Sequence, residues 1–151
     1  MLKPSAIRSR LQTALLAALG SAWAVSRHSY DVFPDGRDSR ELEHKAFAIG
    51  LPQSRPIQGG GRQASAVGVY SGTVVGIRFS FRLRVDAVSA DYNEALDAEH
   101  LIVQHGVRLK EGASANPELG PALLSIDRTT SPDGLHFLGH VQFLVPHRYT
   151  T

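Results

Sequence analysis

The sequence predicts an α+β protein, in which a mostly antiparallel β-sheet carries two main helices packed on one face. The clearest observation is residues 73–85, where apolar and polar side chains alternate as in a strand with one buried face. Two further segments, near residues 5–19 and 90–106, repeat apolar residues at the spacing of a helix. With 151 residues, 42% of them hydrophobic, the chain can bury one core, so we expect a single domain over residues 1–151.

The first helix is expected over residues 5–19 and ends at Gly20, which permits a left-handed cap. The same region also resembles a secretory signal over residues 1–24, because basic residues precede an apolar stretch that ends in small residues. Gln12 and Thr13 interrupt that stretch, which favours the helix but leaves the signal peptide as an alternative. No run reaches the ~20 apolar residues that a membrane-spanning helix requires, so no membrane association is expected.

The remaining elements are expected to be strands joined by turns. They are predicted near residues 26–33, 43–50, 64–85, 122–130 and 135–145. Pro-Asp-Gly sequences mark turns between the first two strands and between the last two. Gly72 and Gly76 are candidates for bends or bulges in the long third segment, and the sequence leaves open whether this segment is one strand or a hairpin.

Residues 51–63 are predicted to form a flexible arm, because they contain prolines and a glycine triplet. No helix pattern follows the triplet, so a phosphate-binding loop is disfavoured. Long loops of this kind commonly become ordered when they bind a partner.

The residues of common catalytic and metal sites are absent or badly spaced. The chain has no cysteine, no Gly-x-Ser-x-Gly elbow and no phosphate loop ending in Gly-Lys-Ser or Gly-Lys-Thr. His136 and His140 would share one strand face but lie roughly 13 Å apart, too far to bind one metal ion. His100 and His105 would point in different directions on a helix. We therefore expect a binding function, with no catalytic, cofactor or metal site.

The charged residues favour an interface. The formal net charge is only +2, but 13 of the 16 basic residues are arginine, which suits bidentate contacts with carboxylate or phosphate. Arg78, Arg82 and Arg84 share the polar face of the alternating segment. A solvated strand face would explain them as well, but the choice of arginine favours a contact that orders the guanidinium groups, with a neighbouring subunit or with phosphate.

Three segments of the chain match the pattern of a known family. They are His44-Lys-Ala-Phe-Ala-Ile-Gly-Leu-Pro, Ile77-Arg-Phe-Ser-Phe-Arg-Leu-Arg and Asp91-Tyr-Asn-Glu-Ala-Leu-Asp-Ala-Glu, with a Gly-rich loop between the first two. Together they resemble the tail-terminator proteins of long-tailed, siphovirus-like bacteriophages. The resemblance covers residues 40–105, and the final pair of strands agrees in the order of elements. Val85-Asp-Ala-Val-Ser departs from the pattern, in which a more polar turn containing lysine is expected.

The resemblance implies a small α+β subunit that forms a hexameric ring at the head-proximal end of the tail. Such a ring caps the tail tube, ends its polymerisation and joins the tail to the head and neck. The implied partners are further copies of this chain, the tail tube protein and the neck or connector proteins. Packaged DNA would pass through the channel without sequence-specific binding. The implied location is the virion, after assembly in the host cytoplasm.

In such a ring, the arm and the turn near residues 33–40 are candidate contacts with the tube or the next subunit, and the arginine row is a candidate contact with the next subunit or the DNA channel. The candidate residues of the arm are Ile57, Gly59, Gly60, Gly61 and Arg62. Three alternatives remain open from the sequence alone, and the weakest is an enzyme of unfamiliar type, supported only by the histidine and acidic residues. Another head-to-tail joining protein, such as a neck or connector-completion ring, shares the same size, composition and symmetry. A secreted binding domain becomes the better interpretation if residues 1–24 are a cleaved signal peptide.

Overall fold

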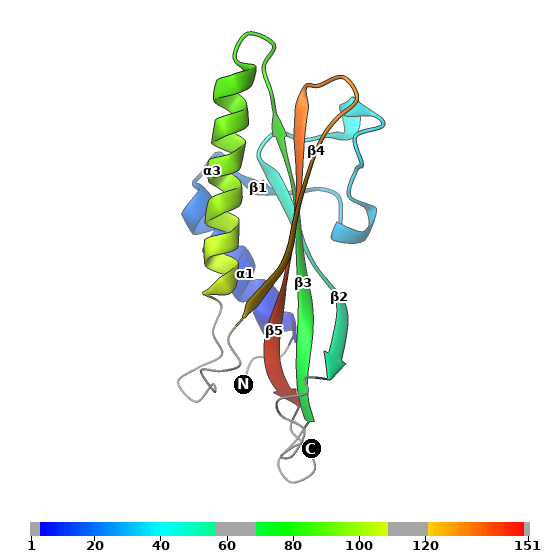
Figure 1. Cartoon of the computed structure of the whole chain (residues 1–151), viewed down its shortest axis with the longest axis vertical. Coiled ribbons are helices and arrows are strands. Elements are labelled where there is room, and N and C mark those ends of the chain that lie inside the picture. The colour runs from blue at the N-terminus through cyan, green and yellow to red at the C-terminus, as the bar shows by residue number, and fades with distance from the viewer. Residues whose placement is uncertain (1–3, 57–68, 109–120, 150–151) are drawn as a thin grey trace.

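The computed structural model describes residues 4–56, 69–108 and 121–149 and confirms the predicted α+β class (Figure 1). The helices are α1 (Pro4–Leu19) and α3 (Val88–Val107), and two short 3₁₀ turns are η1 (Tyr30–Val32) and η2 (Ser39–Glu41). The strands are β1 (Ala24–Val25), β2 (Ala46–Pro56), β3 (Val69–Arg82), β4 (Ala122–Thr130) and β5 (His136–Tyr149). The second helix and the two closing strands are therefore confirmed.

The five strands form one sheet in the order β1-β2-β3-β5-β4. Neighbouring strands are antiparallel except for β1 and β2, which are parallel and share only two residue pairs. β3 and β5 stay in register along the whole of residues 69–82 without a break. This part of the third segment is therefore one continuous strand rather than a hairpin, and Gly72 and Gly76 pair regularly with β5 instead of marking bends.

Both helices cover the same face of the sheet, and the hydrophobic core lies between the two layers (Figure 1). The odd-numbered residues of β3 point into this core, as the alternation predicts, and Val75, Ile77 and Phe79 are fully buried. Side chains from α1, α3 and β5 complete the core, among them Ile7, Leu11, Leu15, Ala95, Ala98, Ile102, Phe137, Val141 and Phe143. Apolar burial therefore holds the helices to the sheet.

The helix predicted at the start of the chain is confirmed. α1 places three fully buried side chains in the core, and Gly20 follows the helix with a φ of +95°, a conformation that glycine adopts readily. Trp23 is also buried, and its ring centroid lies 6.2 Å from that of Phe79. Cleavage of residues 1–24 as a signal peptide would remove these side chains from the core. Neither of the described helices combines the length and apolarity needed to cross a membrane.

The opposite face of the sheet is covered by residues 26–45, which connect β1 to β2 and are called the crossover segment below (Figure 1). Tyr30 lies against the sheet, and the Ser80 hydroxyl donates a hydrogen bond of 2.6 Å to the carbonyl oxygen of Glu43. Gly36, whose φ is +92°, packs closely against Leu138. The centre of the sheet is therefore covered on both faces.

Two predictions about extended segments are wrong. The strand expected at residues 26–33 does not form, because the chain leaves the sheet after Val25 and turns at η1, which carries Tyr30 onto the other face. The flexible arm expected from residue 51 does not form over residues 51–56, because these residues continue β2 against β3. β2 tolerates Pro52 and Pro56 because, among the described strands, only β1 lies along its outer edge. β1 pairs with Ala46 and Phe47 alone, so neither proline has to donate an N–H to it. Residues 57–63 lie outside the described residues.

The close contact between Gly139 and Phe79 provides a test of the packing. A Cβ atom at Gly139 would lie 2.1 Å from Cε1 of Phe79. We expect Gly139→Ala to lower the free energy of unfolding by about 1–3 kcal/mol, because the aromatic ring must move within a packed core. Urea unfolding measures this loss. The same substitution in a Phe79→Leu background should cost less, and an equal cost in both backgrounds would contradict the packing described.

Candidate functional site

The three arginines predicted to form one interface lie in three different environments. Arg78 is half-buried on β3, and its Nη1 donates a hydrogen bond of 3.0 Å to the carbonyl oxygen of Tyr30. Arg84 follows the end of β3 and binds Asp91. Arg82 is exposed, and its guanidinium has no hydrogen bond or ion pair with another described residue. Of the three, Arg82 is therefore the one most available to a partner.

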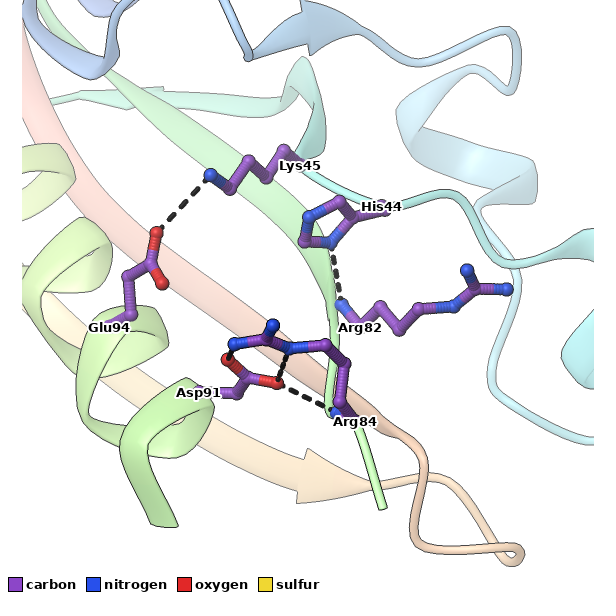
Figure 2. A network of polar contacts seen from close by, with 6 residues as sticks. All are labelled: His44, Lys45, Arg82, Arg84, Asp91 and Glu94. Carbon is purple, nitrogen blue, oxygen red and sulfur yellow. Dashed lines mark hydrogen bonds and ion pairs between the residues drawn. The ribbon is translucent and has the colours of Figure 1, made fainter. Parts of the chain in front are cut away.

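Arg84 and Asp91 fix the turn between β3 and α3 (Figure 2). The guanidinium donates from Nε to Oδ2 and from Nη2 to Oδ1, both at 3.0 Å, and the backbone N–H of Arg84 donates to Oδ2 at 2.8 Å. Asp91 lies in the first turn of α3 with only 3% of its surface exposed. These hydrogen bonds, above all those from the side chain, lower the pKa of Asp91 to about 2. The carboxylate therefore stays charged and paired under ordinary conditions.

Four neighbouring residues extend this arrangement to the two residues that precede β2 (Figure 2). The ammonium group of Lys45 lies 3.2 Å from Glu94 on α3 and 5.7 Å from the ring centroid of Phe81. The backbone N–H of Arg82 donates a hydrogen bond of 3.0 Å to Nδ1 of His44. Partial burial, followed by the nearby cations Lys45 and Arg82, lowers the pKa of His44 and so favours the neutral ring that can accept this bond.

These six residues are called the corner network below: His44, Lys45, Arg82, Arg84, Asp91 and Glu94. The network connects the start of β2, the end of β3 and the first turns of α3. All six lie in the segments 44–52, 77–84 and 91–99 that the sequence analysis singled out. Sequence analysis identified the segments but did not predict that their polar residues meet, because nothing in the local pattern assigns Asp91 to Arg84 or Glu94 to Lys45.

Apolar side chains are exposed beside the corner network. Val85 is 79% exposed and Val88 is 42% exposed, in the turn and at the start of α3. Tyr92, one helical turn further, is 36% exposed and rests edge-on against Phe137. Val85 begins the stretch in which the sequence departs from the family pattern. These exposed apolar side chains are suited to protein contacts.

A second polar cluster surrounds Tyr30 on the other face of the sheet. The ring lies against Gly50 and Gly76, which pair with each other across β2 and β3. The hydroxyl is 2.6 Å from Nε2 of His140, and the carbon at the centre of the Arg78 guanidinium lies 4.6 Å from the ring centroid. Sequence analysis missed this cluster, because up to 110 residues separate its members.

The described residues contain no group of three or more histidine, aspartate or glutamate side chains placed to hold a metal ion. A hollow of about 250 Å³ lies beside the end of β1, with Arg8 and Arg27 in its wall. Nε of Arg8 donates to the carbonyl oxygen of Ile49, and Nε of Arg27 donates to the ring of His28, both at 3.3 Å. Because these groups bond to their neighbours rather than converge on one point, the hollow does not define a ligand site.

The arm residues predicted as contacts lie outside the described residues and stay predictions: Ile57, Gly59, Gly60, Gly61 and Arg62. The geometry therefore offers two candidate regions among the predicted site residues. One is the corner network with its exposed valines and Arg82. The other is the Tyr30 cluster, which includes Arg78 and holds the crossover segment on the sheet.

Loss of the Asp91 charge should weaken the corner network in a pH-dependent way. We expect Asp91→Asn to lower the urea midpoint at pH 7. The pKa of Asp91 is below the ordinary value of about 3.9, so its contribution to stability is complete above that value and is lost as pH falls towards 2. The difference between the variant and the wild type should therefore narrow between about pH 4 and pH 2.

Asp97→Asn, at an exposed position of the same helix, is the matched control and should leave the urea midpoint almost unchanged. A difference between Asp91→Asn and the wild type that stayed constant down to pH 2 would show that the Arg84 contact does not stabilise the charged carboxylate.

The comparisons with known proteins give no family, so a function can be proposed only from the residues and the geometry described above. No family model matches the chain, and no curated protein matches it.

Proposed function

We propose that this chain is a tail terminator of a long-tailed bacteriophage, a structural protein that forms a hexameric ring at the head-proximal end of the tail. One observation carries the proposal. The three segments that resemble this family are separated in sequence, yet they meet in one unit made of β2, β3 and α3. The corner network joins all three by hydrogen bonds and ion pairs. The resemblance therefore coincides with a structural unit rather than with scattered matches.

The surface of the described residues supports a joining function. A ring between a tube and a neck needs two different axial faces, and its subunits need two different lateral surfaces. The corner with Val85 and Val88 lies at one end of the molecule (Figure 1). Leu123 and Leu124, which are 42% and 44% exposed, lie near the start of β4, away from that corner on an outer strand of the sheet. We propose that these two apolar regions contact different proteins of the virion.

The proposal assigns the remaining partners from ring geometry. Copies of the chain would contact each other through unlike surfaces, and Arg82 is the candidate lateral or channel contact. Six weak contacts with the tail tube would add up through effective concentration, so no single contact needs to be tight. The arm residues Ile57, Gly59, Gly60, Gly61 and Arg62 remain candidate tube or subunit contacts. DNA would pass through the ring without sequence-specific binding, and the ring would be assembled in the host cytoplasm.

Two alternatives differ in how they fit the structure. A neck or connector-completion protein fits the same surfaces and differs only in its place in the virion. A secreted binding domain with residues 1–24 removed fits poorly, because Ile7, Leu11 and Leu15 of α1 are fully buried in the core.

Deletion of the gene from its phage separates the two head-to-tail proteins. If the chain is the terminator, the mutant should produce tail tubes of uncontrolled length, because nothing stops polymerisation. If the chain is a neck protein, the mutant should produce tails of normal length that remain unattached to heads. Electron microscopy of the particles, with gold-labelled antibody against the chain on wild-type virions, makes the distinction. Label away from the head-to-tail junction would exclude both.

Charge reversal at Arg82 tests the predicted interface. We expect Arg82→Glu to fail to restore tailed, infectious particles to the deletion mutant, because it reverses an exposed charge that has no partner within the described part of the chain. The free energy of unfolding should change by less than about 0.5 kcal/mol, as is usual for an exposed site. Arg10→Glu, on the exposed side of α1, is the matched control. Full complementation by Arg82→Glu would remove Arg82 from the interface.

A further inference from the structure

Tyr30 occupies a socket that is shaped for its ring. A Cβ atom at Gly50 would lie 2.3 Å from Cδ1 of Tyr30, and one at Gly76 would lie 2.2 Å from its hydroxyl oxygen. The ring can therefore lie on the sheet only because two paired positions on neighbouring strands are glycine. Only 6% of the Tyr30 surface is exposed. This buried aromatic side chain thus attaches the crossover segment to the sheet, in addition to the Ser80–Glu43 hydrogen bond and the contact of Gly36 with Leu138.

The hydroxyl of Tyr30 is held by two side chains of β5. Nε2 of His140 lies 2.6 Å from the hydroxyl oxygen, and the amide of Gln142 donates to the same oxygen at 3.5 Å. The Gln142 amide acts as a donor here, so among the described residues Nε2 of His140 is the acceptor to which the hydroxyl can donate its one proton. This arrangement requires a neutral His140 whose Nε2 is free to accept. Arg78 completes the socket by stacking on the ring and binding the backbone carbonyl of Tyr30.

A proton on His140 would disturb this arrangement in two ways. Nε2 would become a donor, and the hydroxyl proton of Tyr30 would lose its acceptor in a buried place. The new cation would also face Arg78, the residue paired with His140 on β3. Asp127, which pairs with His140 on β4, is exposed and offsets only part of this repulsion. Burial, followed by Arg78, accordingly lowers the pKa of His140.

We propose that the crossover segment is a latch that is closed on the sheet when His140 is neutral and released when His140 takes up a proton. Release would uncover the glycine floor of the socket, together with Ser80 and Leu138, on the face opposite the helices. The proposal does not depend on the phage function, because it rests on the contacts of Tyr30 alone.

The direction of the pH effect follows from the two states of the latch. In the open latch, His140 is expected to have an ordinary pKa of about 6.5. In the closed latch its pKa is lower, so the open state binds more protons between the two values. The closed latch is therefore fully favoured above about pH 6.5 and loses stability as the pH falls below it. For each unit by which the pH falls between these two pKa values, the ratio of open to closed molecules increases by up to about tenfold.

Hydrogen exchange followed by mass spectrometry tests the latch. We expect the amides of Val32 and Phe33, which bond within η1 and its cap, to lose protection at pH 5.0 relative to pH 7.5 after correction for intrinsic exchange rates. Peptides from α3 should keep their protection at both pH values. In His140→Gln, an acceptor remains near the position of Nε2 but cannot titrate, so protection in the crossover segment should be the same at both pH values.

His136→Gln and His44→Gln are the matched controls, because burial also lowers the pKa of these two histidines although neither contacts Tyr30. Both variants should keep the wild-type response. A response that disappears in either control, or that persists in His140→Gln, would overturn the proposal. If His140→Gln does not fold, NMR titration of the wild type decides instead. The ring nitrogens of His140 and the amide of Tyr30 should then titrate together, and an unchanged Tyr30 amide would refute the latch.

Discussion

The structure depends on the burial of β3 from both sides. One face carries the large apolar side chains that meet α1 and α3, and the other face lies beneath the crossover segment. A strand covered twice needs small residues where a second layer comes close, and Gly76 and Ser80 meet this need. Because β3 also pairs with β2 and β5 along its length, it determines the position of every other described element.

The periodicity of β3 explains why the burial of one face of this strand, the face toward the helices, could be predicted. Alternation with a period of two is a local signal, so it identified both the strand and the side chains that face the helices. The other face was harder to interpret, since Gly76 and Ser80 look like solvent-exposed positions in the sequence. Their cover comes from Tyr30, which bonds with Arg78 across 48 residues and with His140 across 110. No local pattern contains this information.

Arg78 and Arg84 of the candidate site likewise make contacts that no local sequence pattern could predict. Residue type and parity predicted that contacts with a partner order Arg78, Arg82 and Arg84, but Arg78 and Arg84 are ordered by contacts within the chain, and the contact of Arg82 with a partner stays a prediction. Arg84 is used within the chain to fix the first turn of α3, and Arg78 is used to hold Tyr30. Partner choice depends on the register between strands and on the angle at which α3 leaves the sheet. Both are tertiary properties, so only Arg82 keeps the role that its sequence position suggested.

The strands β2 and β4, near the two edges of the sheet, are each irregularly paired with their inner neighbour. The pairing of β2 with β3 is interrupted between Gly50 and Gln53, and that of β4 with β5 between Leu123 and Ser125. Such interruptions bend a strand and spoil the even row of N–H and C=O groups that another chain could copy. These interruptions make the sheet a poorer template for the strands of a second copy.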